Sequence, residues 1–283
     1  MAKQFTITEI NDIFSKEIKS CRPAMICTAG FGLSAKFEQQ GGADMVCVCS
    51  SSVYTADGHS PILSYLPYGN ANDMTLKTIK RISSQIKAVP LMAGVCATDP
   101  TTDLVAYLDI LKFYNVSAVM NSPCIGFFNQ DILSVLETVG ISYEKEIEFI
   151  KMASRKGFYS VGTAFNTAQA QMMANAGANA VICDLGMTID ISHKRREQCE
   201  EVATDKLQRM SRAIRAVSPD IAIFVHGGPL NTPEAARKIL PYTGACGLFL
   251  ASAVEKFPVE KPLADAVKQF KDASLNYVER NNG

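Results

Sequence analysis

Short apolar runs alternate with longer amphipathic stretches along this chain of 283 residues. The apolar runs contain consecutive Val, Ile, Ala, Met and Cys residues, and unbroken runs of this kind are typical of strands buried on both faces of a parallel sheet. Eight such runs, alternating with helical patterns, predict an α/β fold, the closed (β/α)8 TIM barrel, rather than an open doubly wound sheet. The predicted strands cover residues 24–27, 45–49, 90–94, 118–120, 159–162, 180–183, 221–225 and 246–250.

The segments outside these strands refine the predicted barrel. An extra helix begins near Thr8, before the first strand. After the second strand, residues 50–73 show no clear periodicity and predict a long loop, whose three tyrosines favour an ordered lid over disorder. No linker interrupts the pattern, and barrels of about 250 residues form one unit, so residues 1–283 are predicted to form a single TIM-barrel domain.

Charge and hydropathy narrow the class of protein. The 28 basic and 28 acidic residues cancel, and no Lys/Arg stripe accompanies aromatic residues, so we expect no nucleic-acid partner. Neither a leader pattern at the first residues nor an apolar run of about 18 residues is present. We therefore expect a cytoplasmic protein without a membrane partner that binds a small anionic molecule, and a homo-oligomer as the default for such enzymes.

Nine cysteines raise the question of disulfides or zinc. The chain has no C-x-x-C pair, and most of the cysteines fall in or beside the predicted strands, where they act as small hydrophobic residues. Cys96 and Cys124 follow strands and could reach a ligand. We do not expect a cysteine nucleophile.

The last two predicted strands carry the signals of an anion site. His226, Gly227 and Gly228 directly follow the seventh apolar run, and the eighth run begins near Gly247 and leads into the small residues Ser252 and Ala253. Glycines let main-chain N–H groups approach a ligand, and a helix beginning at small residues can attract an anion. Because phosphate binds at this place in many barrels, we predict that these positions bind an anion.

The segment after the first strand supplies further candidate ligand-binding residues, namely Gly30, Gly32, Ser34 and Lys36. Ser34 can cap the following helix, and Lys36 in its first turn could reach an anion. A tight turn for the two glycines, a capping serine and a surface lysine explain the same residues equally well. The G-x-G pair has no third glycine and does not indicate a dinucleotide site.

Polar residues at other strand ends are candidates for chemistry. Asp99 could act as a base or hold a metal, although Thr-Asp-Pro is also an ordinary turn. Asn121 could bond a carboxylate or satisfy its own turn, and Asp184 places a second acid at the barrel mouth. Glu144 could handle protons or merely oppose a helix dipole.

His226 is the strongest single candidate for catalysis. It follows an apolar strand, and an imidazole can act as acid, base or hydrogen-bond donor near neutral pH. A histidine satisfied by neighbouring main-chain atoms is the alternative. Glu255 also follows the predicted anion site, but an acid beside a phosphate would repel it, so Glu255 is interpreted as structural.

Several segments in order give the chain a family resemblance. They are GFGLSAK (30–36), GGAD (41–44), LPYGNAN (66–72), MAGVCATDP (92–100), HGGP (226–229) and LASAVE (250–255). Together they resemble the phosphoenolpyruvate hydrolase-like family, also described as TIM-barrel signal-transduction proteins. The resemblance implies a TIM barrel and a hydrolase acting on a small phosphorylated or phosphonate 2-oxo or enol acid. His226, with Asp99 or Glu144, would then manage protons.

The chain departs from that family's pattern at two strand ends. Ser50 and Val53 stand where the family has Asn and Arg, and Asp184 stands where it has His. The lost arginine and the changed acid favour, as alternatives, a ligand-sensing or protein-interaction barrel without catalysis, or a lyase or aldolase-type cleavage of a C–C bond. The metal and cofactor are unknown from sequence; magnesium held by Asp99 or Asp184 is compatible with it, since Mg²⁺ often needs one or two carboxylates.

Overall fold

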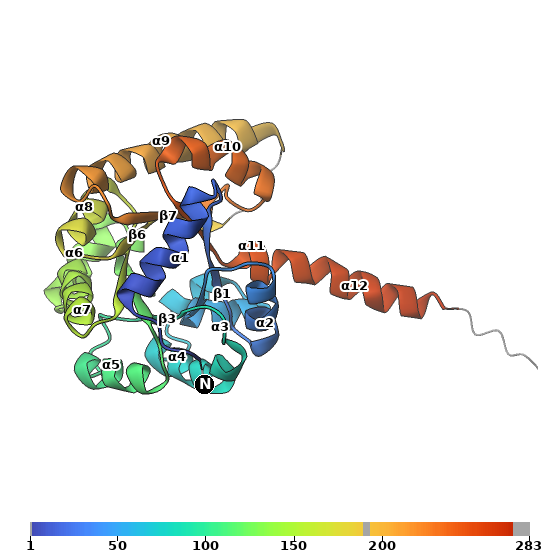
Figure 1. Ribbon diagram of the computed structural model, residues 1–283, viewed down its shortest axis with the longest axis horizontal. Coiled ribbons are helices and arrows are strands. Elements are labelled where there is room, and N and C mark those ends of the chain that lie inside the picture. The colour runs from blue at the N-terminus through green and yellow to red at the C-terminus, as the bar shows by residue number, and fades with distance from the viewer. Residues whose placement is uncertain (1, 189–192, 274–283) are drawn as a thin grey trace, which may run out of the picture.

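The computed structural model describes residues 2–188 and 193–273, and its strands form one closed barrel in chain order (Figure 1). Every neighbouring pair is parallel, and the barrel closes where Ala24 to Cys27 pair with Gly247 to Leu250. The predicted TIM barrel and its eight strands are confirmed. The strands are β1 (Ala24–Thr28), β2 (Met45–Val48), β3 (Leu91–Val95), β4 (Ala118–Asn121), β5 (Tyr159–Ala164), β6 (Ala180–Thr188), β7 (Ala222–Gly228) and β8 (Gly247–Leu250).

Helices connect the strands and cover the barrel from outside. The covering helices are α2 (Gly32–Gln40), α4 (Ala71–Ile82), α5 (Leu104–Phe113), α7 (Tyr143–Arg155), α8 (Thr167–Asn175), α9 (His193–Val217) and α10 (Pro233–Thr243). Shorter elements are α3 (Ser50–Ala56), α6 (Gln130–Thr138), α11 (Ser252–Glu255) and the 3-10 turns η1 (Pro61–Tyr65), η2 (Ser83–Gln85) and η3 (Ile125–Phe127). Among the described residues, no helix is both long and apolar enough to cross a bilayer.

The unbroken apolar runs reflect burial on both faces of the sheet. Inside the barrel, large side chains such as Ile26, Met92, Tyr159 and Phe224 fill the axis. Outside, the alternate residues of the same strands pack against the helices in a second cluster. Each strand therefore needs apolar residues at consecutive positions, and this requirement produced the pattern in the sequence.

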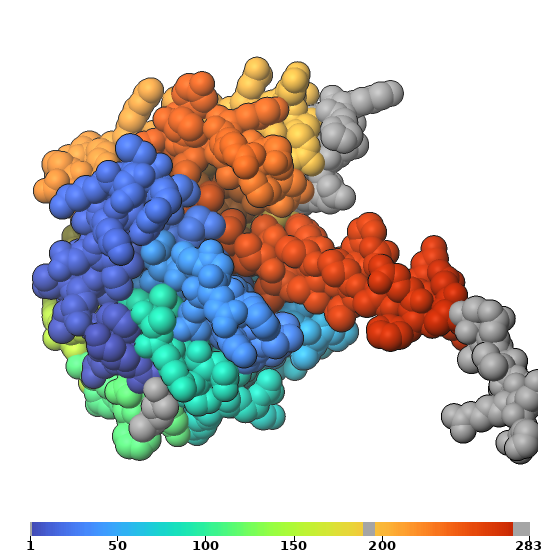
Figure 2. Space-filling view, turned by 45° about the vertical axis from the view of Figure 1, so that its right-hand side comes forward, coloured from blue at the N-terminus to red at the C-terminus, as the bar shows by residue number. Residues whose placement is uncertain are grey.

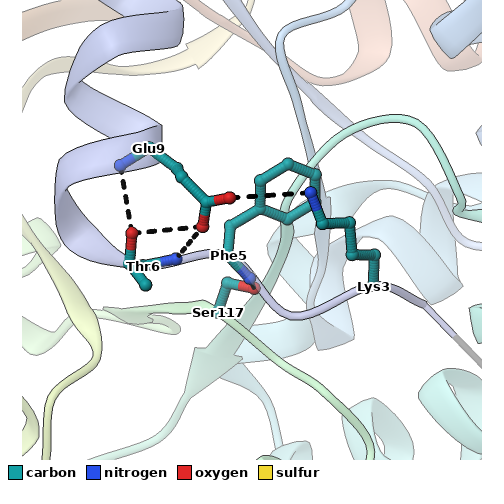
Figure 3. A network of polar contacts seen from close by, with 5 residues as sticks. All are labelled: Lys3, Phe5, Thr6, Glu9 and Ser117. Carbon is teal, nitrogen blue, oxygen red and sulfur yellow. Dashed lines mark hydrogen bonds and ion pairs between the residues drawn. The ribbon is translucent and has the colours of Figure 1, made fainter.

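The predicted extra helix is α1 (Ile7–Lys19), which lies across the amino-terminal end of the barrel (Figure 1). Its Phe14 ring packs edge-on against Tyr159 and Phe224, with centroids 5.9 and 5.1 Å apart. A capping box of Thr6 and Glu9 begins the helix (Figure 3). This helix closes one end of the barrel.

Residues 50–73 are more regular than the long loop that the sequence predicts. They contain α3, η1 and the first turn of α4 (Ala71–Ile82). Serine and threonine are weak helix formers because their side chains compete for main-chain groups, and here Ser52 Oγ and Thr55 Oγ1 bond main-chain oxygens at 2.7 and 2.9 Å. Both bonds are local, to Cys49 and Ser51, so the side chains of weak helix formers themselves bond the main chain of α3.

The last helix, α12 (Phe257–Lys271), leaves the body of the barrel (Figures 1 and 2). None of its residues is buried. It begins one residue after α11, with Lys256 between them.

Candidate active site

A small cavity lies at the carboxyl-terminal end of the strands. Its volume is about 70 Å³, which is room for about five water-sized groups. Asn121, Asp184 and His226 contribute polar side chains to it. The other lining residues are Cys49, Ser51, Pro61, Ser64, Tyr65, Met120, Ser122, Cys124, Thr163, Phe165, Gly186, Met187, Thr188, Phe249, Ala251 and Ser252.

The imidazole of His226 is held in one orientation. Its Nδ1 atom lies 2.8 Å from the main-chain oxygen of Phe249, and the ring packs edge-on against the Phe249 ring. Because a carbonyl oxygen only accepts hydrogen bonds, Nδ1 carries the proton in the neutral ring. The Nε2 atom is then an acceptor, available to a group in the cavity.

Asp184 lies beside His226 on the neighbouring strand, where the two residues are paired in the β6–β7 register. Its Oδ1 accepts the Gly186 N–H at 2.7 Å. Burial raises the pKa of the Asp184 carboxyl, against the opposing effects of His226 and the Gly186 N–H. A carboxylate at Asp184 would stabilise the positive charge of a protonated His226 ring.

Asn121 is fully buried and held from two sides. Its Nδ2 donates to Glu146 Oε2 at 2.7 Å, and its Oδ1 accepts the Thr163 N–H at 2.7 Å. This fixes the amide at the cavity wall with one N–H of Nδ2 left for a ligand.

Glu146 is a buried acid that the sequence interpretation missed. Its carboxylate accepts from the Ile125 N–H at 2.8 Å and the Cys124 thiol at 2.9 Å, besides Asn121. Burial raises its pKa to about 7, opposed by these hydrogen bonds. The signal was its position on the apolar stripe of α7, between the buried residues Tyr143 and Ile150.

Glu144, predicted to handle protons, lies exposed in the first turn of α7. It is not among the residues that line the cavity. The structure therefore brings Glu146, two residues later, toward Asn121 and leaves Glu144 in solvent.

The carboxylate of Asp99 accepts hydrogen bonds from the turn that follows β3. It accepts hydrogen bonds from Asn70 Nδ2 at 2.7 Å, from the Thr101 N–H and hydroxyl, and from the Thr102 hydroxyl at 2.6 Å. Burial opposes its ionisation, but these donors outweigh burial and lower the pKa of Asp99. Asp99 does not line the His226 cavity, and its geometry is that of a turn-binding carboxylate.

The donors predicted for an anion after β1 hold an acid of the chain itself. The Gly30 N–H and the Thr28 hydroxyl donate to the buried Glu255 carboxyl, the hydroxyl at 3.1 Å. The Ser34 hydroxyl lies 3.4 Å from the same carboxyl and donates to the Phe31 main-chain oxygen at 2.9 Å. Burial raises the pKa of Glu255 to about 8. This geometry fits a structural role for Glu255. Its carboxyl stands where a bound anion would contact Gly30 and Ser34.

Other predicted ligand-binding residues after β1 and at β8 lie away from the cavity. Lys36 is exposed, with Nζ 5.5 Å from the centroid of the Phe37 ring. Gly32 opens α2 beside Gln85, and Gly247 begins β8 at the opposite end of that strand from the mouth. Close approach of β1 explains Gly247, because an added Cβ would lie 2.1 Å from the Ala24 oxygen.

Gly227 and Gly228 end β7 with φ of +80° and +56°. An added Cβ on Gly227 would lie 2.0 Å from the Gly186 oxygen, and one on Gly228 would lie 3.2 Å from Leu185 Cβ. The close approach of β6 therefore requires these glycines. Among the small residues predicted to bind an anion here, Ser252 lines the cavity, whereas Gly227, Gly228 and Ala253 do not.

The charges around the cavity are few. Its lining contains Asp184 and His226 and, within the described residues, no lysine or arginine. The described part of the chain also holds no cluster of three or more His, Cys, Asp or Glu residues placed for a metal. A bound anion would thus rely on neutral donors and on His226.

Comparison with known sequences identifies the family. The profile described as phosphoenolpyruvate hydrolase-like matches residues 9–273. The chain belongs to this family. The ToMV resistance protein Tm-1(GCR237) of Solanum lycopersicum is 33% identical over 280 residues, 97% of this chain and 37% of that protein. The ToMV susceptible protein tm-1(GCR26) is 33% identical over 262 residues, 92% and 35% respectively. This member of the family thus spans little more than a third of those relatives.

Solved structures share the barrel of this family member. A phosphonopyruvate hydrolase complex with oxalate and Mg²⁺ gives a TM-score of 0.62 at 13% identity, covering 95% of this chain and 90% of that one. A phosphoenolpyruvate phosphomutase from Streptomyces platensis subsp. rosaceus gives 0.62 at 14%, covering 94% and 86%. At such identities the likeness shows the fold alone.

Proposed function

We propose that this chain is a hydrolase acting on a small 2-oxo or enol acid that carries a phosphoryl or phosphonate group. The observation that carries the proposal is the His226 ring, fixed through Nδ1 on Phe249 with Nε2 free as an acceptor beside Asp184. Membership of the phosphoenolpyruvate hydrolase-like family supports the substrate class.

The chemistry follows from that ring. In hydrolysis of a phosphoenolpyruvate-like ester, water adds to phosphorus and gives up a proton while the P–O bond breaks. His226 Nε2 takes the proton, Asp184 stabilises the imidazolium, and the released enolate oxygen or its carbon is protonated in turn, giving phosphate and pyruvate. A positioned base of this kind contributes roughly 10²–10⁴-fold to rate.

Neutral donors would bind the acid end of the substrate. Asn121 has an N–H of Nδ2 left over, and the hydroxyls of Ser51 and Ser252 lie in the same wall. Ser64 and Tyr65 of η1 line one side of the cavity. Tyr65 packs against Phe127 at a centroid distance of 4.7 Å, which connects η1 to η3.

Magnesium, if the reaction uses it, would be held in this wall by a single protein carboxylate. Asp184 is the carboxylate among the lining residues, and magnesium often takes one or two carboxylates together with oxygens of its substrate. Bound there, the ion would supply positive charge that the lining side chains lack.

The test is a thermal-shift screen of the full chain against phosphate, phosphoenolpyruvate, phosphonopyruvate, pyruvate and oxaloacetate, with and without Mg²⁺, with assays for phosphate and pyruvate release. Ligands stabilise according to their concentration relative to Kd, so weak binders register. His226→Gln should lower the rate of phosphate release at least about 100-fold. The matched control is His59→Gln, at an exposed histidine. Unchanged turnover in His226→Gln would rule out the proposed role of His226 as the base.

A second candidate is a ligand-sensing barrel without turnover. The cavity lining has no described lysine or arginine to hold a phosphoryl dianion, and two curated relatives are named for resistance and susceptibility to a virus rather than for a reaction. Binding in the screen without product release would favour this candidate. The absence of a lysine from the described lining also leaves an aldolase-type Schiff base without a nucleophile.

A further inference from the structure

The hydroxyl of Thr163 is buried without a hydrogen-bond partner. Thr163 is the last residue but one of β5, and only 3% of its surface is exposed. Its Oγ1 atom makes no hydrogen bond within the described chain. Buried polar groups are nearly always hydrogen-bonded, because a group that loses water on folding needs a replacement. The unpartnered hydroxyl therefore needs an explanation.

The strand directs this side chain into the mouth of the barrel. Successive side chains of a strand point to opposite faces, and Tyr159 and Val161 of β5 belong to the cluster inside the barrel. Thr163 is the next residue on that face, and it lines the His226 cavity. The inner face of β5 thus changes from apolar to polar at the level of the cavity.

Hydrogen bonds of the main chain fix the position of this hydroxyl. The Thr163 N–H donates to Asn121 Oδ1 at 2.7 Å, and the Thr163 main-chain oxygen accepts the Tyr143 hydroxyl at 2.7 Å. Threonine is branched at Cβ, which restricts its χ1 angle, whereas the hydroxyl hydrogen can turn toward any acceptor. The oxygen is thus held in place, and its hydrogen is available to a ligand.

Local bonding does not account for the hydroxyl. Threonine hydroxyls often bond nearby main-chain oxygens, as Thr55 Oγ1 does in α3 at 2.9 Å, but Thr163 makes no such bond. Thr75 in α4 also has a buried, unpartnered hydroxyl and does not line the cavity. Among the described residues, Thr163 is the only one that combines such a hydroxyl with a place in the cavity wall.

We propose that Thr163 Oγ1 donates a hydrogen bond to the carboxylate of the acid bound in the His226 cavity. This role rests on the proposed function for the class of acid, and it assigns the end of the acid that β5 binds. The described lining contains no lysine or arginine, so neutral donors must hold the carboxylate. Hydrogen bonds to a charged acceptor are roughly twice as strong as bonds between neutral groups.

The order of the strands sets how the acid lies. Strand β6 separates β5 from β7, and neighbouring strands are about 4.8 Å apart, so the ends of β5 and β7 are roughly 10 Å apart. Thr163 and His226 therefore contact different ends of the acid. Glu146, which bonds Asn121 at 2.7 Å, lies behind the Thr163 side and would repel a phosphoryl dianion more than a carboxylate. The phosphoryl or phosphonate end thus faces His226.

The first experiment measures ligand binding by Thr163→Val, which removes the hydroxyl and nearly keeps the shape of the side chain. Thermal-shift titrations of the full chain use pyruvate, methyl pyruvate and inorganic phosphate. The Kd for pyruvate should rise at least about tenfold in Thr163→Val, and Thr163→Ser, which retains a hydroxyl, should bind pyruvate nearly as the wild type does. Methyl pyruvate, which lacks the carboxylate, and inorganic phosphate should bind Thr163→Val and the wild type alike.

Thr75→Val is the matched control. It removes an equally buried and unpartnered hydroxyl outside the cavity, so the Kd for pyruvate should not change. Neither valine variant should lower the urea midpoint of unfolding, because each loses a buried hydroxyl that bonds nothing. A lower midpoint for Thr163→Val alone would show that the fold uses this hydroxyl and would overturn the proposal. Wild-type affinity of Thr163→Val for pyruvate would also overturn it.

Turnover of phosphoenolpyruvate separates this role from the proposed hydrolysis. Thr163→Val should raise KM with little change in kcat, because it removes binding common to the ground state and the transition state. Binding of pyruvate that depends on Thr163, without phosphate release by the wild type, would support the carboxylate site and overturn the hydrolase function. Phosphate release with an unchanged KM in Thr163→Val would support the hydrolase function and overturn the carboxylate site.

Discussion

Asn121 Nδ2 and Glu146 Oε2 lie 2.7 Å apart with no solvent exposure at either residue. The same carboxylate accepts the Ile125 N–H and the Cys124 thiol, so one acid holds the end of β4 to η3 and sets the amide of the cavity wall. A buried carboxylate is tolerated when it is hydrogen-bonded in this way. Glu146 is thus a positioning residue for the candidate site.

Removal of Glu146 should be costly to the fold. Glu146→Ala leaves Asn121 Nδ2 and the Ile125 N–H without their partner, and each unpaired buried donor costs about 1–3 kcal/mol. We expect a loss of about 3 kcal/mol in the free energy of unfolding, measured with urea. Glu144→Ala, two residues away and exposed, should change it by less than about 0.5 kcal/mol. Equal effects of the two changes would contradict the assignment.

Asp184→Asn should affect the chemistry more than the stability. An asparagine oxygen can still accept the Gly186 N–H, whereas the negative charge beside His226 is lost. We expect kcat for product release to fall about tenfold or more, and any stabilisation by Mg²⁺ in the thermal-shift assay to disappear. The variant should unfold within about 1 kcal/mol of the wild type. Full turnover together with an unaltered Mg²⁺ response would argue against a role for Asp184.

Gly227 and Gly157 separate backbone strain from steric clash. They have nearly the same φ, +80° and +79°, but an added Cβ meets the Gly186 oxygen at 2.0 Å only in the first case and nothing within 4 Å in the second. Gly157→Ala should cost about 1 kcal/mol for the left-handed backbone. Gly227→Ala should cost about 3 kcal/mol or more, since the main chain of β6 must also move. Urea unfolding of both variants checks the difference; similar losses would refute the close approach.

Glu38 should make stability depend on pH. Both of its carboxyl oxygens are buried without a described hydrogen-bond partner, and burial raises its pKa to about 8. Ionisation is therefore easier in the unfolded chain, so the folded state loses stability as pH rises from about 4.5 through about 8.

The variant Glu38→Gln removes this ionisation. Relative to wild type, its free energy of unfolding should be nearly equal at pH 5 and about 2 kcal/mol higher at pH 9. Glu137→Gln, at an exposed glutamate, should show no such trend. A constant difference between Glu38→Gln and wild type across this pH range would count against the buried, unpaired state of Glu38.

The strand pattern could be predicted because burial on both faces acts on consecutive residues, and the eight apolar runs report it directly. Residues at the strand ends could also be predicted from the sequence. Asn121, Asp184 and His226 lie in the cavity wall, as their places in the barrel imply. The helical content of residues 50–73 could not be predicted, because the serines and threonines of this segment give no periodic signal.

The partners of polar residues were the harder part. Gly30 and Ser34 have the donors of an anion site, but the carboxyl that they hold comes from Glu255, more than 220 residues away in the chain. The sequence favours Glu144 over Glu146 as a candidate because acids in the first turn of a helix are stabilised by the helix dipole. Only the three-dimensional packing distinguishes a buried acid from an exposed one two residues earlier.

Large side chains fill the axis of the barrel, and Phe14 of α1 packs against them at the amino-terminal end. A ligand of the His226 cavity therefore enters from the carboxyl-terminal end of the strands, where η1 lines the cavity. Substrate and product then use the same entrance to the cavity. Because the product must leave before another substrate molecule can bind, the product of the proposed reaction should be a competitive inhibitor.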